Sequence, residues 1–147
     1  ITDPRMTRFW ITLEQAVDFV LNCLERMVGG ELFIPKIPSM NIMDLARAIA
    51  PECRTRIIGI RPGEKLHEVL LPQDEARNTV EYKDHFIIQP VFDFWGSRFN
   101  PNGGKQVPDD FEYNSMTNPQ FLTIEEMRKR IKPYIQEFED ENAAVIS

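Results

Sequence analysis

The chain has 147 residues, a formal net charge of −6 and 42 % hydrophobic residues. This length allows one domain with a modest core. The negative charge argues against nucleic-acid binding by bulk electrostatics, although individual arginines can still hold a phosphate. No apolar run approaches the roughly 18–20 residues that cross a bilayer, so we expect no membrane partner.

A few residues bear on cellular location. Cys23 and Cys53 match no metal-binding spacing, which predicts free thiols in a reducing compartment. No secretory signal is visible at the start, so we expect a cytoplasmic protein. The sequence begins at Ile1 without an initiator methionine, and we therefore expect a piece of a longer protein.

The first predicted element is a helix over residues 13–27. Thr12 and Gln15 have the spacing of a capping box, and Gly29 with Gly30 predicts where the helix stops. Apolar residues recur at helical spacing and predict one buried face: Leu13, Val17, Val20, Leu21, Leu24 and Met27.

The middle of the chain predicts short elements. Residues 31–38 read as a strand that ends at a proline, and Asn41 can cap a helix over residues 42–49. The run of β-branched residues at 54–60 predicts a buried strand, and residues 64–71 have the spacing of a short helix.

The last third predicts less regular structure. Residues 79–82 and 85–90 are weak strand candidates. Residues 91–120 are rich in aromatic residues, Asn, Gly and Pro, which predicts an ordered loop or arm. A final helix should start at Thr123 with Glu126 closing a capping box, and Pro133 should kink or end it.

The stretch "IRPGEKLHEVL" follows the predicted strand at 54–60. Pro62 fixes φ and Gly63 permits a turn, while the Arg61 guanidinium suits phosphate oxygens and the Glu64 carboxylate suits a vicinal diol. This predicts a site that binds ribose and phosphate together. The alternative is a solvated turn with an internal Arg–Glu ion pair, and spacing alone leaves both open.

A second arginine lies in the stretch "MTRFW". Arg8 could clamp a phosphate, or its side chain could pack over Trp10 as a cation–π pair. His67 and His85 have no partner pattern for a metal, so we expect no metal site.

Two patterns of nicotinamide enzymes are missing from the sequence. It contains no G-x-G-x-x-G turn, and no tyrosine is followed by lysine four residues later. If the protein is such an enzyme, its catalytic half must lie outside this chain.

The chain resembles the inverting UDP-N-acetylglucosamine 4,6-dehydratases of the extended short-chain dehydrogenase/reductase superfamily. The resemblance covers residues 1–131 and lies in "DPRMTRFWITLEQAVDFVL", "GGELFIPKIPSMNIMDLARAIAP", "IIGIRPGEKLHEVLL" and "FEYNSMTNPQFLTIEEMR". The group that starts pseudaminic acid synthesis for flagellin glycosylation is the most similar. Residues 132–147 show no recognised motif, and we expect a frayed C-terminal extension there.

The resemblance implies the C-terminal substrate-binding part of such an enzyme. The N-terminal Rossmann domain, with NADP and the catalytic residues, would lie upstream of Ile1, so no catalytic or cofactor-binding residue is expected in this chain. The implied partners are a UDP-sugar, the Rossmann domain and further copies of the protein. The expected fold is α/β, or α+β as an isolated piece, with a small mixed sheet and about four helices.

The resemblance also implies roles for individual residues. Arg8 and Arg61 would contact the diphosphate, Glu64 would take the ribose hydroxyls, and Met6 with Thr7 would line the nucleotide pocket. Tyr113, Asn114 and Ser115 recur in the family's tail without an assigned role. The alternative function is a stand-alone, non-catalytic module that binds nucleotide or mediates assembly. If the other half is missing, an apolar interface should be exposed and the chain should self-associate.

Overall fold

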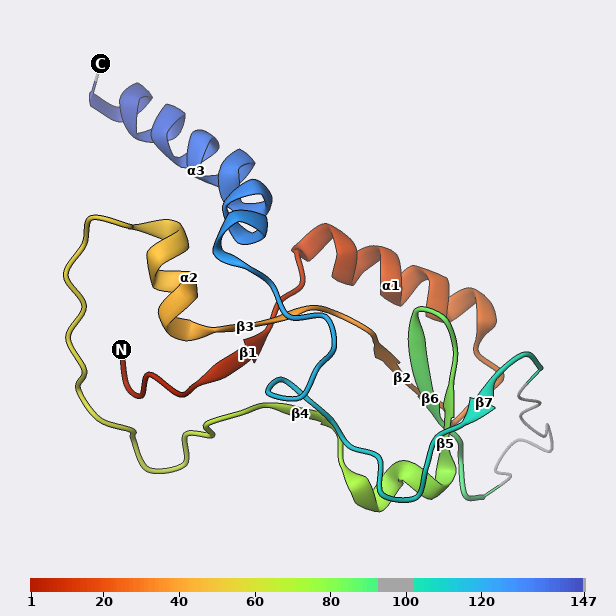
Figure 1. The fold of residues 1–147 in the computed structure, drawn as a ribbon. Coiled ribbons are helices and arrows are strands. Elements are labelled where there is room, and N and C mark those ends of the chain that lie inside the picture. Colours follow the sequence, from red (N-terminus) through yellow and green to blue (C-terminus); the bar gives the residue numbers. More distant parts are fainter. Residues whose placement is uncertain (93–101, 147) are drawn as a thin grey trace.

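The structure is a computed structural model that describes residues 1–92 and 102–146, with side chains up to residue 136. Three small antiparallel sheets and four helices form the described part (Figure 1). The helices are α1 (Leu13–Arg26), α2 (Ile42–Ile49), the 3-10 helix η1 (Gln73–Asn78) and α3 (Ile124–Ile146). The strands are β1 (Thr7–Phe9), β2 (Leu32–Pro35), β3 (Ser39–Asn41), β4 (Val69–Leu71), β5 (Thr79–Glu81), β6 (His85–Ile88), β7 (Lys105–Gln106) and β8 (Tyr113–Asn114).

The sheets pair segments that lie far apart in the sequence. The largest sheet has the order β2-β6-β5-β7, and the two-stranded sheets are β1-β3 and β4-β8. The pairing is antiparallel in all three, and the described parallel pairing is one isolated bridge between Ser39 and Phe121. The prediction of a mixed α/β fold with helices is confirmed, but the single mixed sheet is replaced by three antiparallel ones.

Two clusters of buried residues form the core. The first lies under the large sheet and the β4-β8 pair, and contains Ile34, Leu71, Ala76, Phe86, Val107 and Tyr113. The second joins β3, α2 and α3, and contains Met40, Leu45, Ala48, Leu122 and Met127. The predicted strands at 79–82 and 85–90 correspond to β5 and β6, whose alternating side chains supply Phe86 to the first cluster.

In helix α1 the predicted capping box is confirmed, but the predicted burial of its apolar face is wrong. The Gln15 N–H donates to Thr12 Oγ1 at 3.2 Å, and the Thr12 N–H donates to Gln15 Oε1 at 3.1 Å. No residue of α1 is buried in the described structure. The predicted core face is exposed, with values from 48 % to 77 %, at Leu13, Val17, Val20, Leu21, Leu24 and Met27.

The capping box of α1 gives a direct test of local stability. Thr12→Ala removes the hydroxyl that accepts from the Gln15 N–H, and we expect the free energy of unfolding to fall by about 1 kcal/mol. Chemical denaturation measures the change. Thr12→Ser keeps the acceptor and should keep most of the stability; equal losses in both variants would contradict the assignment of the cap.

The helices α2 and α3 also begin where the sequence predicts. Asn41 Oδ1 accepts from the Met43 N–H at 2.8 Å, and Thr123 forms the second capping box with Glu126. These hydrogen bonds from Thr123 hold the pKa of Glu126 below its usual value. Pro133 does not end the helix, because α3 continues to Ile146 and extends away from the three sheets (Figure 1).

Two predicted elements are wrong. Residues 54–60 form no strand: they are exposed and outside regular secondary structure, and Figure 1 shows them within a long extended connection. Residues 64–71 form no helix, because their last part pairs as β4 with β8. The predicted arm at 91–120 supplies β7 and β8, and its residues 93–101 lie outside the described residues.

Candidate functional site

The Arg-Pro-Gly-Glu motif forms a tight turn. The Arg61 N–H donates to Glu64 Oε2 at 2.8 Å, and the Glu64 N–H donates to the Arg61 carbonyl at 3.1 Å. Gly63 has a φ of +83°, which a side chain with a Cβ would strain, and Pro62 fixes its own φ as the second residue of a turn. The sequence therefore folds locally because each of these residues suits its turn position.

The turn leaves its charged groups available. Arg61 is exposed, and within the described residues its guanidinium has no hydrogen-bond or ion-pair partner. The internal ion pair that the alternative interpretation expects is replaced by a bond between the Glu64 carboxylate and the Arg61 backbone. Glu64 Oε1 has no described partner. The Arg61 guanidinium and one Glu64 carboxylate oxygen thus lie on the same turn without described partners.

Arg8 lies on β1 and contacts the segment that follows this turn. Its guanidinium donates to the Leu66 carbonyl at 3.1 Å and to the Lys65 carbonyl at 3.0 Å. Arg8 Nε lies 3.4 Å from Glu68 Oε1. No contact with the Trp10 ring is found in the described part of the chain. Arg8 therefore holds the segment 65–68 against β1.

Behind Arg8 lies a group of buried hydroxyls. Thr7 Oγ1 is 2.8 Å from His67 Nδ1 and 2.6 Å from Ser115 Oγ. The Glu68 N–H donates to Ser115 Oγ at 2.9 Å, and the Ser115 N–H donates to the Glu68 carbonyl at 2.8 Å. Thr7 is 5 % exposed and Ser115 is 0 % exposed. These contacts join β1, the segment after the turn and the end of β8.

The structure brings the predicted binding residues into one region. Met6, Thr7 and Arg8 are consecutive, and the Arg8 guanidinium reaches the backbone next to Glu64. Met6 and Thr7 are buried, whereas Arg61 and Glu64 lie on the turn. The sequence analysis missed the contacts of His67 and Ser115. The only available signal was that both residues lie in stretches that carry the family resemblance.

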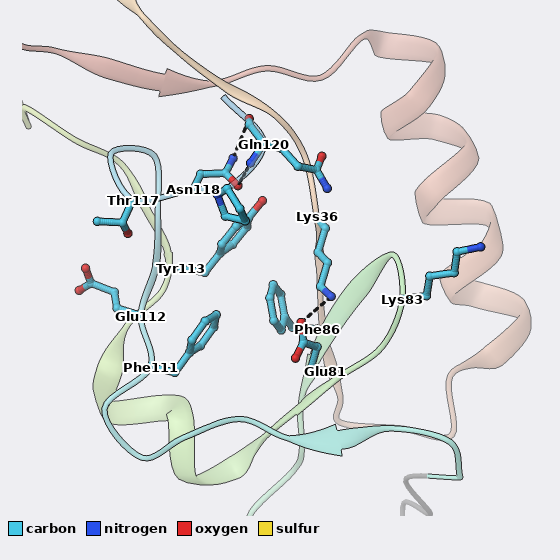
Figure 2. Close-up of a pocket in the computed structure, with 11 residues that line it drawn as sticks. Lys36, Glu81, Lys83, Phe86, Phe111, Glu112, Tyr113, Thr117, Asn118 and Gln120 are labelled. Carbon is cyan, nitrogen blue, oxygen red and sulfur yellow. Dashed lines mark hydrogen bonds and ion pairs between the residues drawn. The ribbon is translucent and has the colours of Figure 1, made fainter. Parts of the chain in front are cut away.

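A separate pocket of about 230 Å³ lies beside the large sheet (Figure 2). Its walls are the rings of Phe86, Phe111 and Tyr113, with centroids 5.3 Å and 5.1 Å from Phe86. Burial raises the pKa of the Tyr113 phenol. Lys36 Nζ lies 2.7 Å from Glu81 Oε1, so this ammonium is already paired. The pocket contains none of the predicted binding residues.

Neither a metal centre nor a membrane span is found in the part of the chain that the structure describes. No group of three or more His, Cys, Asp or Glu residues lies close enough to hold a metal ion there. No helix within it is long and apolar enough to cross a bilayer.

The described part is a small mixed α/β fold, and comparison with known proteins gives its family. Residues 1–90 match the family of polysaccharide biosynthesis proteins, and the chain belongs to this family. It is 49 % identical over 133 residues to the inverting UDP-N-acetylglucosamine 4,6-dehydratase of Campylobacter jejuni, a match of 86 % of this chain and 40 % of that protein. The UDP-glucose 4-epimerase of Rickettsia massiliae is 32 % identical, over 93 % of this chain and 42 % of the epimerase.

A solved structure has the same fold. The X-ray structure of Pen from Bacillus thuringiensis superposes with a TM-score of 0.75 at 31 % identity, covering 91 % of this chain and 40 % of that one. The chain thus spans about 40 % of the length of the dehydratase that it matches. The resemblance found from the sequence motifs is confirmed.

Proposed function

We propose that this chain is the nucleotide-sugar-binding part of an inverting UDP-N-acetylglucosamine 4,6-dehydratase that supplies surface or flagellar glycan synthesis. The whole enzyme would oxidise C4 of UDP-N-acetylglucosamine, eliminate water across C5 and C6, and return the hydride to C6. The product would be a 4-keto-6-deoxy sugar nucleotide with C5 inverted. The 49 % identity to a dehydratase of this class supports the proposal.

In this proposal the cofactor and the nucleotide are bound by different parts of the enzyme. It has no glycine-rich dinucleotide turn and no Tyr-x-x-x-Lys pair, so NADP and the proton-transfer groups would be held by an N-terminal Rossmann domain outside it. The residues of this chain would bind and orient the nucleotide. Cytoplasmic location and homo-oligomeric assembly stay predictions.

The observation that carries the proposal is the unpaired Arg61 side chain beside Glu64. A guanidinium binds two phosphate oxygens in a planar fork, and the free Glu64 oxygen can accept from the ribose hydroxyls. The bond between Glu64 Oε2 and the Arg61 N–H holds the Glu64 carboxylate against the backbone of Arg61. Arg61 would therefore contact the diphosphate, while the Glu64 carboxylate would accept hydrogen bonds from the ribose hydroxyls.

The proposed roles of Met6, Thr7 and Arg8 depend on the contacts and the burial of each side chain. Arg8 already contacts three backbone carbonyls and Glu68, so a diphosphate at Arg8 would compete with the Glu68 carboxylate. Met6 and Thr7 are 2 % and 5 % exposed, so they would line the nucleotide pocket from its inner side.

The test is calorimetric titration of the full-length protein with UDP and then with UDP-N-acetylglucosamine. Arg61→Ala removes a charged hydrogen-bond partner, and we expect the affinity for UDP to fall by about 1.5–3 kcal/mol, or roughly 10- to 150-fold.

The matched control is Arg54→Ala, which removes an exposed arginine from the same connection without touching the turn. It should change the affinity less than about twofold. Equal affinities in the wild type and in Arg61→Ala would refute the assignment of the turn as a nucleotide site.

A further inference from the structure

The turn at 61–64 is anchored mainly from its downstream side. Upstream, residues 54–60 are exposed, and within the described chain their hydrogen bonds to other segments go to Ile1. Downstream, the Thr7 N–H donates to the Leu66 carbonyl at 3.0 Å, and Glu68 exchanges two hydrogen bonds with Ser115. The position of the turn therefore depends on how firmly residues 65–68 are held.

The hydroxyls of Thr7 and Ser115 form the buried centre of this anchor. Ser115 Oγ accepts the Glu68 N–H, so its own proton can go on to Thr7 Oγ1, 2.6 Å away. The Thr7 hydroxyl then donates to His67 Nδ1 at 2.8 Å. In this arrangement each hydroxyl both donates and accepts. The hydrogen bonds therefore run without a gap from the Glu68 N–H through Ser115 and Thr7 to His67 Nδ1.

Removing one hydroxyl would interrupt this chain of hydrogen bonds where Thr7 and Ser115 are buried. Thr7→Val keeps the shape of the side chain, but it removes the hydroxyl that lies between Ser115 Oγ and His67 Nδ1. The Ser115 hydroxyl then retains the Thr7 carbonyl, 3.2 Å away, as its acceptor, and His67 Nδ1 loses its described partner. A buried group that loses its partner costs more than the bond itself is worth. We expect residues 65–68 to respond by moving away from β1 and carrying the turn with them.

We propose that Thr7 and Ser115 are positioning residues that hold the Arg61–Glu64 turn in its nucleotide-binding geometry through His67 and Glu68. This inference rests on the proposed function. Thr7 would act from the inner side of the nucleotide pocket, and its hydroxyl would bond to Ser115 and His67 and not to the ligand. A binding site tolerates only small displacements of its groups, so a loosened anchor should lower affinity without any lost ligand contact.

The first measurement is the affinity of the full-length protein for UDP in Thr7→Val. We expect binding to weaken about 5- to 30-fold, the effect of one broken buried partnership. The matched control is Thr79→Val: Thr79 on β5 is also buried, at 0 % exposure, but its hydroxyl donates to the Glu75 carbonyl of η1, away from the anchor. It should lose stability similarly and change the affinity less than about twofold.

The second measurement separates positioning from ligand contact. If Thr7 acts through Arg61, adding Thr7→Val to Arg61→Ala should weaken binding little further, because the group being positioned is already absent. Fully multiplicative effects would overturn the proposal. His67→Asn, which offers an acceptor near the position of Nδ1, should bind UDP better than His67→Gln, which mimics Nε2. The reverse order would also overturn it.

Amide hydrogen exchange keeps the test independent of the proposed function. Thr7→Val and Ser115→Ala should speed exchange at residues 65–68, whereas Thr79→Val should not. Unchanged exchange at these residues would refute the anchor. If the wild-type protein does not bind UDP, the proposed function fails, and the exchange rates then decide whether the anchor exists.

Discussion

Leu71→Ala is expected to lower the free energy of unfolding by about 2–5 kcal/mol, the range for deleting a fully buried leucine side chain. Leu71 is 0 % exposed and belongs to the core cluster that includes Phe86 and Tyr113. It lies on β4, which follows directly after residues 65–68. The cavity would therefore open on the strand that continues residues 65–68, and denaturant titration measures the loss.

The neighbouring residue provides the control for this substitution. Leu70 has the same side chain but is 37 % exposed, so Leu70→Ala should cost about 1 kcal/mol or less. Equal losses at the two positions would show that β4 does not have the described register. A loss of UDP affinity in Leu71→Ala at temperatures where the protein stays folded would link the core to the turn.

Self-association of the isolated 147-residue chain is the second expected result. The helix α1 presents apolar side chains that the described structure leaves uncovered, with Leu21 at 56 % and Leu24 at 59 % exposure. A contiguous apolar surface of this kind marks an interface. In the full protein this face would pack against the N-terminal half, and in its absence a second copy can cover it. Sedimentation at increasing concentration measures the association.

A matched pair of substitutions locates this interface. Leu21→Lys places a charge on the apolar face, and Asn22→Lys adds the same charge on the polar side of α1. A leucine is worth about 1.5–3 kcal/mol when buried, and a two-fold interface contains it twice, so Leu21→Lys should weaken association by about 3 kcal/mol or more, which is about 100-fold or more. Asn22→Lys should leave it nearly unchanged. A monodisperse wild-type monomer at high concentration would contradict the prediction.

The sequence predicts well those features whose causes are local. The starts of α1, α2 and α3 are set by Thr12, Asn41 and Thr123, whose side chains bond to backbone within three residues. The turn at Gly63 is local in the same way, because its positive φ is a property of one residue. These elements could be placed without knowledge of the rest of the fold.

The two wrong elements depend on partners that spacing does not show. Residues 54–60 have strand propensity, but no described strand pairs with them, and an unpaired strand is not stable in water. Residues 64–71 have helical spacing, yet the Leu66 carbonyl and the Glu68 backbone are bonded to Thr7 and Ser115. Tertiary hydrogen bonds thus replace the ladder that a helix would need.

In the candidate site, too, the local features can be predicted from the sequence and the contacts between distant segments cannot. The motif identifies Arg61 and Glu64 as a pair with suitable chemistry, because both lie in one turn. It does not reveal that Arg8 contacts Lys65 and Leu66, which are 57 and 58 residues away. Such contacts are set by the pairing of whole segments, and periodicity within a segment carries no information about them.

The bond between Thr7 and Ser115 closes a loop of 108 residues, and this has a consequence for synthesis on the ribosome. At about 5–20 residues per second, Ser115 is made roughly 5–20 s after Thr7. Until then β1 lacks the hydroxyl partner that completes the anchor. The turn at 61–64, the proposed nucleotide site, should therefore be among the last parts of the chain to become ordered, since contacts of high sequence separation form late. A nascent chain stalled before residue 115 contains the β5 and β6 segments and can pair them, but it should lack an ordered turn.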